Sequence, residues 1–242
     1  MKKVVLIETS TYLDVLSKFG IGGAHPGGLQ LTKEIFKNVK MNKTSHLLDV
    51  GCGTGQTAAY LATKFGAKGT GIDISPIMVE KARNRMAHHQ LPVEIIQGSI
   101  EKCPLMDETF DFIISESVLS FVNKPKALKE INRLLKKNGR FIANELTINQ
   151  PLTAIAATEI KQTYGLDTLL MEKEWIALFE QTGFKHIKIR KQKPPILQNQ
   201  TMPELQLSGN IEPQHYAILN QHFNIMGKYQ GILDYGIFSS RK

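Results

Sequence analysis

Short apolar runs alternate with amphipathic stretches between residues 46 and 147, and this alternation constrains the fold more than any other feature of the chain. The apolar runs have the length of strands, and the segments between them space their apolar residues as helices do. Such alternation is typical of a parallel sheet covered by helices. The run Phe112-Ile113-Ile114 is apolar at consecutive positions, as expected for a strand buried on both faces.

The same reading predicts individual elements along the whole chain. Strands are expected at 46–50, 69–74, 93–97, 110–115, 140–146, 185–191 and 232–239. Helices are expected at 29–39, 56–65, 125–137, 151–163, 172–182 and 213–226, and one more begins at Ser75-Pro76. Ser75 can cap that helix with Pro76 in its first turn, while Gly66 and Asn138-Gly139 are expected to end helices.

A glycine-rich turn, Asp49-Val50-Gly51-Cys52-Gly53-Thr54-Gly55, directly follows the first strand of this region and opens a helix. Glycines permit a tight turn there and let the backbone approach a ligand without a Cβ clash. A dinucleotide fingerprint needs a glycine at position 56, which is Gln56. No lysine follows in the position of a phosphate-binding P-loop, so the turn indicates a different ligand.

Asp73 ends the second strand, about 20 residues beyond this turn. An acidic side chain at that place can accept hydrogen bonds from both ribose hydroxyls of an adenosine ligand. The turn, its position between strand and helix, and Asp73 together favour an adenosine-containing ligand.

With these motifs, the segment 47–147 resembles the core of class I methyltransferases that use S-adenosylmethionine (SAM), in particular the group that acts on small molecules. The resemblance implies an α/β fold: a Rossmann-like, seven-stranded, mostly parallel sheet with helices on both faces, an antiparallel last strand and an N-terminal helical lid. It implies one domain over 1–242, with a cap at 1–45, a SAM-binding core at 46–147 and substrate-side helices and final strands at 148–242.

The resemblance also implies a set of cofactor contacts. Asp49 and the backbone of the turn would face the methionine part of SAM, Asp73 would hold the ribose, and two apolar side chains would pack on the adenine. The turn residues are Gly51, Cys52, Gly53 and Gly55, and the apolar side chains are Ile74 and Met78.

Two segments match the family with differences. Where the family often has an aspartate that binds the adenine amino group, this chain has Ser99, so the Ser99 hydroxyl or the Ile100 amide would serve the adenine edge. Glu116 and Ser117 follow the fourth strand and would lie near the sulfonium, contributing backbone groups. Arsenite methyltransferases carry a thiol at the position of Ser117, and with two cysteines in the chain an arsenic acceptor is not expected.

Methyl transfer from a sulfonium requires alignment of the acceptor and exclusion of water more than it requires a catalytic triad. A base helps if the acceptor is a hydroxyl or a protonated amine. The candidates are His25, in a loop rich in glycine before a helix, and Glu145, at the end of the fifth strand. Each has an alternative role, His25 as part of an ordinary turn and Glu145 as a polar strand-end residue.

The acceptor pocket is expected from the variable segments 1–30, 151–175 and 193–231. Aromatic residues in or next to these segments are candidates for its walls, and each can instead be a packing residue. They are Tyr12, Phe19, Tyr164, Trp175 and Tyr216.

The net charge of +8 permits nucleic-acid binding, but the densest basic cluster, 185–193, has no aromatic residues interleaved for base stacking. A solvated basic surface is therefore expected, with an RNA methyltransferase or a non-catalytic SAM-binding protein as alternatives. No apolar run approaches the ~18 residues of a membrane span, and the cysteines have no metal-ligand spacing. His215 and His222 have no third ligand at suitable spacing, so no metal site is expected, and the expected location is cytoplasmic.

Overall fold

A computed structural model describes residues 10–190 and 203–242 of the chain. Parts of three segments named above lie outside the described residues, namely the starts of the expected pocket segments 1–30 and 193–231 and the end of the basic cluster 185–193. No helix within the described ranges is both long and apolar enough to cross a membrane.

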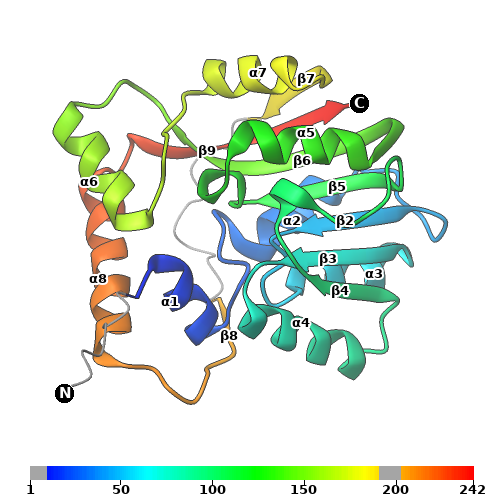
Figure 1. The fold of residues 1–242 in the computed structure, drawn as a ribbon, viewed down its shortest axis with the longest axis horizontal. Helices are drawn as coiled ribbons and strands as arrows, with labels where there is room; N and C mark the ends of the chain where they lie inside the picture. The colour runs from blue at the N-terminus through cyan, green and yellow to red at the C-terminus, as the bar shows by residue number, and fades with distance from the viewer. Residues whose placement is uncertain (1–9, 191–202) are drawn as a thin grey trace, which may run out of the picture.

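The centre of the molecule is a seven-stranded sheet with the strand order β4-β3-β2-β5-β6-β9-β7 (Figure 1). The first five strands in this order, β4, β3, β2, β5 and β6, run parallel to one another. Strand β9 is antiparallel to both of its neighbours, as the sequence predicted for the last strand. The bounds are β2 (His46–Val50), β3 (Lys68–Asp73), β4 (Val93–Gln97), β5 (Phe110–Glu116), β6 (Leu135–Ile148), β7 (Lys185–Arg190) and β9 (Leu233–Arg241).

Helices cover both faces of this sheet. Because successive strand residues point to opposite faces, neighbours such as Ile113 and Ile114 belong to different apolar layers. Ile113 packs in the layer that contains Leu128 of α5 and Phe179 of α7, and Ile114 packs in the layer that contains Phe36 of α2. The helices are α2 (Gly28–Phe36), α3 (Gln56–Phe65), α4 (Pro76–His88), α5 (Lys124–Leu134) and α7 (Glu172–Gln181), with short 3-10 turns η1 (Ile100–Lys102) and η2 (Leu119–Phe121).

Three further helices, α1 (Tyr12–Phe19), α6 (Ala154–Tyr164) and α8 (Pro213–Lys228), pack against one another beyond one end of the strands (Figure 1). A two-stranded sheet joins the N-terminal and C-terminal parts of this region, because β1 (Ile21–Gly22) pairs antiparallel with β8 (Glu204–Leu205). We call α1, α6, α8 and the β1–β8 pair the cap. The expected N-terminal helical lid is part of it, but the sequence did not predict the β1–β8 pairing.

One helix end differs from the sequence prediction. Helix α5 ends at Leu134 rather than near residue 137, because Leu135 already pairs with Phe110 of β5. The register then shifts, so that the next partners are Phe112 and Arg140. Asn138 has the predicted left-handed conformation (φ 62°), but it lies in this bulge instead of ending the helix.

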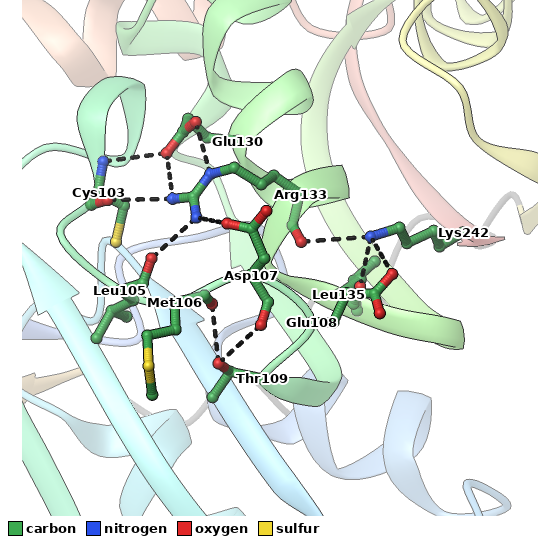
Figure 2. A network of polar contacts seen from close by, with 10 residues as sticks. All are labelled: Cys103, Leu105, Met106, Asp107, Glu108, Thr109, Glu130, Arg133, Leu135 and Lys242. Atoms are coloured by element: carbon green, nitrogen blue, oxygen red, sulfur yellow. Dashed lines mark hydrogen bonds and ion pairs between the residues drawn. The ribbon is translucent and has the colours of Figure 1, made fainter.

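A polar network ties the connection between β4 and β5 to α5 (Figure 2). The Arg133 guanidinium donates to the Glu130 carboxylate at 2.7 and 3.0 Å, to the carbonyl oxygens of Leu105 (2.9 Å) and Cys103 (3.1 Å), and to Asp107. The hydrogen bond from Arg133 lowers the pKa of Glu130, and that bond raises the pKa of Arg133. This network fixes the loop that leads into β5, whose far end enters the site described next.

Candidate functional site

The glycine-rich turn after β2 has the left-handed backbone that its glycines were expected to supply. Gly51, Gly53 and Gly55 have φ values of 62°, 53° and 75°. A Cβ at Gly51 would lie 2.4 Å from Val118 Cγ2, and one at Gly55 would lie 2.6 Å from Met86 Cε. A Cβ at Gly53 would meet nothing within 4 Å, so Gly53 faces the open side of the turn, where a ligand can approach the backbone.

Asp73, at the end of β3, braces this turn. Its carboxylate accepts the Gly53 N–H at 2.8 Å and the Ser75 N–H at 2.9 Å, and the Ser75 hydroxyl in turn caps α4. Burial raises the pKa of Asp73. Both carboxylate oxygens keep lone pairs for further donors, so the geometry is compatible with the expected ribose contact.

Asp49 lies beneath the turn, at the end of β2, and is almost fully buried. It accepts the Ala58 N–H from the first turn of α3 at 3.1 Å. Burial and, secondarily, the nearby Glu116 carboxylate raise the pKa of Asp49 well above its ordinary value. Cys52 is buried in the turn, where its thiol packs against Gly71 and burial raises the pKa of the Cys52 thiol.

Glu116, at the end of β5, is held by side chains from two helices. Its carboxylate accepts the hydroxyls of Thr32 on α2 (2.8 Å) and Thr57 on α3 (2.7 Å). His25 Nε2 lies 3.4 Å from Glu116 Oε2, and both side chains are more than nine-tenths buried. The structure therefore brings His25 and Glu116 together, and the side chain of Glu116, rather than only its backbone, enters the site.

Asn144 on β6 completes this cluster. Its Nδ2 lies 3.4 Å from His25 Nδ1 and donates to the Pro26 carbonyl at 3.1 Å, while its Oδ1 is buried without a hydrogen-bond partner among the described residues. The sequence analysis missed Thr32, Thr57 and Asn144. A signal existed for Asn144 alone, because a buried strand-end amide at the ligand-binding edge of a parallel sheet needs a partner.

Glu145, the other candidate base, points to the opposite face of β6. Its Oε1 accepts the Ser115 hydroxyl (2.7 Å) and the N–H groups of Val118 (3.2 Å) and Leu119 (3.1 Å). Burial raises the pKa of Glu145 to about 7. Its Oε2 is buried without a hydrogen-bond partner in the described part of the chain. Glu145 thus holds the loop that follows β5, and it does not meet His25.

The remaining predicted cofactor residues line the same edge with different exposures. Ile74 is 67% exposed, whereas Met78 and Ile100 are buried. The Ser99 hydroxyl accepts the Glu101 N–H at 3.2 Å and thereby caps the start of η1. Ser117 has a left-handed backbone (φ 62°) and donates its N–H to the Asn144 carbonyl at 2.8 Å, which joins the ends of β5 and β6.

Strand β8, which we call the strap, connects the rest of the cap to the helices that flank the glycine-rich turn. Glu204 accepts from Arg85 Nη2 of α4 at 2.7 Å and from Gln56 Nε2 of α3 at 2.8 Å. Arg85 Nε also donates to the Thr54 carbonyl within the turn at 2.8 Å. One carboxylate on β8 therefore connects the strap to both helices that flank the turn.

Aromatic side chains gather between the cap and η2. The Tyr12 ring stacks on Phe121 (6.3 Å between centroids) and meets Tyr164 edge-on (4.9 Å), and the Tyr164 hydroxyl lies 2.9 Å from His222 Nδ1. Burial raises the pKa of Tyr12 to about 12 and lowers the pKa of His222. These rings are therefore neutral near neutral pH.

The other expected pocket residues divide between cap and core. Phe19 and Tyr216 contact each other in the cap, with ring centroids 5.3 Å apart. Trp175 is instead fully buried in the layer under α5 and α7, where its indole N–H donates to the Leu146 carbonyl, so its interpretation as a pocket residue was wrong. Within the described residues no group of three or more His, Cys, Asp or Glu side chains is arranged to hold a metal ion.

Comparison with known proteins identifies the class. Residues 41–202 match a family model described as a methyltransferase domain. The methyltransferase YodH of Bacillus subtilis, named as uncharacterized, is 36% identical over 233 residues, which is 96% of this chain and all of that protein. Demethylmenaquinone methyltransferase of Staphylococcus haemolyticus is 29% identical, over 65% of this chain and 76% of that protein.

Solved structures share the fold. Phosphoethanolamine N-methyltransferase 2 of Haemonchus contortus, determined with SAM, superposes with a TM-score of 0.76 at 17% identity, covering 95% of this chain and 57% of that one. The chain therefore belongs to the methyltransferase domain family. It is a SAM-dependent methyltransferase with the Rossmann-like, class I fold that the sequence predicted.

The acidic side chains and the open backbone of the site are compatible with this cofactor. Asp49, Asp73 and Glu116 place three buried or largely buried carboxylates around the turn, and burial raises the pKa of Asp49 and of Asp73. SAM carries a sulfonium and an ammonium, so it would relieve the repulsion between these carboxylates. The open side of Gly53 leaves room for the ligand beside them.

Proposed function

We propose that this enzyme transfers the methyl group of SAM to a small-molecule acceptor held between the carboxyl ends of the strands and the cap. The observation that carries the proposal is the set of carboxylates around the open side of Gly53, next to which Glu204 of the cap is bonded to the helices that flank the turn. SAM supplies an electrophilic methyl group on a sulfonium, so the protein needs to align an acceptor and exclude water. Relatives named for small acceptors, demethylmenaquinone and phosphoethanolamine, support this substrate class.

For the cofactor we propose the contacts that the sequence predicted. Asp49 and the turn residues Gly51, Cys52, Gly53 and Gly55 would hold the methionine part, and Asp73 the ribose. Ile74, Met78, Ser99 and Ile100 would surround the adenine, and Glu116 and Ser117 would lie near the sulfonium. The exposed side chain of Ile74 supports the adenine assignment, and the left-handed backbone of Ser117 supports the sulfonium assignment.

We propose His25 as the base that takes the proton of the acceptor. Glu116 lies 3.4 Å from its ring, and a carboxylate there stabilises the imidazolium that forms. Asn144 orients the ring from the other side. Glu145 is the second candidate, supported by its pKa of about 7 and the unpartnered Oε2.

An RNA acceptor has less support. Three carboxylates, those of Asp49, Asp73 and Glu116, lie around the glycine-rich turn, and the nearby Arg85 is already paired with Glu204, whereas a phosphate backbone requires basic partners. The division of the domain into an N-terminal segment at 1–45, a SAM-binding core at 46–147 and substrate-side elements at 148–242 is kept as a proposal, although the cap as defined above draws on the first and the last of these segments. Because both cysteines, Cys52 and Cys103, are free, we also propose a cytoplasmic location.

The general test uses labelled SAM and a panel of phenols, amines, thiols and carbon acids. Release of S-adenosylhomocysteine that depends on an acceptor is the expected result. SAM binding without release for any acceptor would favour a non-catalytic SAM-binding protein. Stronger thermal stabilisation by NAD than by SAM would contradict the cofactor assignment itself.

The base is tested with His25→Gln and Glu145→Gln. Loss of a general base lowers kcat by roughly 100-fold or more, so we expect that loss for His25→Gln, with SAM affinity changed less than about threefold. A loss of kcat confined to Glu145→Gln would assign the base to Glu145. A loss of SAM affinity without a loss of kcat in His25→Gln would show that His25 contributes to cofactor binding and not to proton transfer.

A further inference from the structure

An open cavity of about 590 Å³ lies at the amino ends of the central strands, on the edge of the sheet opposite the glycine-rich turn. Thr44 and Ser45, which precede β2, line it, whereas Gly51 follows β2. Among the residues that the structure describes, five basic side chains line this cavity, against one acidic side chain. The basic residues are Lys40, Lys136, Lys137, Arg140 and Arg241, and the acidic residue is Asp111. We call this the amino-edge cavity.

The single acid is already neutralised within the protein. Asp111 accepts the Lys136 ammonium at 2.8 Å and the His46 backbone N–H at 2.9 Å. The other four basic side chains, those of Lys40, Lys137, Arg140 and Arg241, form no ion pair with any described residue. The cavity therefore carries an excess of about four positive charges with no counter-charge from the described chain.

Two of these cations oppose each other directly across a strand pair. Arg140 of β6 and Arg241 of β9 are register partners, and like charges placed opposite each other in a sheet destabilise it. Arg140 is half-buried, its Nε donates to the Ser239 hydroxyl at 2.9 Å, and burial together with Arg241 lowers the pKa of Arg140. Lys185 of β7 is the partner of Arg241 on the other side, which adds a third cation to the row.

We propose that the amino-edge cavity binds a small anion with two or more phosphate groups, a nucleotide or an inorganic polyphosphate. Paired guanidinium groups match the oxygens of a phosphate, and an anion between Arg140 and Arg241 removes their repulsion. The cavity volume is in the range of small-ligand sites, larger than one phosphate requires. Asn38, Asn42, Thr44 and Ser45 add neutral polar groups to the wall.

This site is separate from the methyl-transfer site. The five residues of β2 lie between the two edges, which is roughly 17 Å of extended chain. The proposal therefore does not rest on the proposed function. A ligand bound at this edge leaves the SAM site accessible.

The test is calorimetric titration of the full-length protein with sodium tripolyphosphate at low ionic strength. We expect saturable binding, and at least tenfold weaker binding for the double variant Arg140→Gln, Arg241→Gln. The matched control is Lys126→Gln, Lys228→Gln, which removes the same charge from two exposed lysines elsewhere and should change the affinity less than twofold. The double variant loses the hydrogen bonds from Arg140 to Ser239 and from Arg241 to the Asn138 carbonyl together with the repulsion between the arginines, so its melting temperature without ligand is measured first to establish that it folds.

Further ligands distinguish the sources of the anion. ATP binding as tightly as tripolyphosphate would show that phosphates alone are recognised, and tighter ATP binding would place the nucleoside in the remaining cavity volume. Absence of saturable binding, or equal weakening in both double variants, would overturn the proposal. So would tighter binding of an RNA oligonucleotide that tripolyphosphate does not displace. If the double variant fails to fold, Arg241→Gln alone, at an exposed position, gives the same comparison.

Discussion

The two edges of the central sheet carry opposite charges. At the carboxyl edge, Asp49, Asp73 and Glu116 surround the glycine-rich turn, and burial raises the pKa of Asp49 and of Asp73. At the amino edge, Arg140 and Arg241 oppose each other in a cavity where Asp111, the one acid that lines it among the described residues, is already paired. Each edge thus gathers ionisable side chains of mostly one kind, acids at the carboxyl edge and bases at the amino edge.

The difference teaches how one parallel sheet can present two unlike surfaces. All loops that follow the parallel strands meet at one edge, and all segments that precede them meet at the other. A run of five or six strand residues is therefore enough to separate an acidic site from a basic one. The acidic edge suits a sulfonium cofactor, and the basic edge suits a phosphorylated anion.

The largest expected effect comes from removing one charge at the carboxyl edge. Asp73→Asn should weaken SAM binding by roughly 100-fold, because hydrogen bonds to a charged, buried group are worth about 1.5–3 kcal/mol each. Tripolyphosphate binding should not change. Calorimetric titration of the variant with each ligand measures both effects.

Asp107→Asn is the control for this charge change. Asp107 is an exposed partner of Arg133 in the connection that precedes β5 (Figure 2), and its substitution should leave both ligands unaffected. Unchanged SAM affinity in Asp73→Asn would remove the ribose assignment. A parallel loss of tripolyphosphate binding would show that the two edges are not independent.

A change of pH is expected to have an intermediate effect, on the stability of the cofactor-free protein and on its affinity for SAM. Burial and Glu116 raise the pKa of Asp49, so the folded, cofactor-free protein holds a proton that the unfolded chain has already released. The stability of the cofactor-free protein therefore falls as pH rises from the unfolded pKa to the folded pKa. Since cationic SAM favours the ionised form, its affinity should rise with pH over this range, by at most about tenfold per unit for one proton.

Asp49→Asn should flatten both pH dependences. Titrations of the two proteins between about pH 5 and 8, in buffers with different ionisation heats, measure proton release on SAM binding directly. Asp73, whose pKa is also raised by burial, contributes in the same direction and remains in the variant. SAM affinity that falls with rising pH would contradict the role of carboxylates in attracting the cofactor.

The smallest effect is expected at the strap. Glu204→Gln keeps the shape of the side chain but weakens its bonds to Arg85 and Gln56, which flank the turn. The Glu204 side chain is 37% exposed, so solvent screens the pair and the expected rise in the KM for SAM is about threefold to tenfold. Steady-state kinetics with Glu180→Gln, an exposed acid on α7, as the control measures it. A change in kcat alone would place the strap on the acceptor side.

Local sequence patterns predicted most of the core. The turn at Gly51, Gly53 and Gly55 was predictable because each glycine answers a local need for a left-handed backbone. Asp73 was predictable because its distance from the turn follows from one strand–helix–strand unit. The end of α5 was not predictable from local patterns, because the pairing of Leu135 with Phe110 of β5 decided where the helix ends.

The sequence by itself determined the alternating strands and helices, the glycine-rich turn, Asp73 and hence the class of enzyme. Only the tertiary structure decided that Glu116, His25 and Asn144 form one cluster and that Glu145 points away from it. It also decided that Arg140 and Arg241, 101 positions apart in number, stand opposite each other. Local backbone preferences act within a few residues, whereas these contacts depend on which strands pair and in which register, which the whole packed sheet decides.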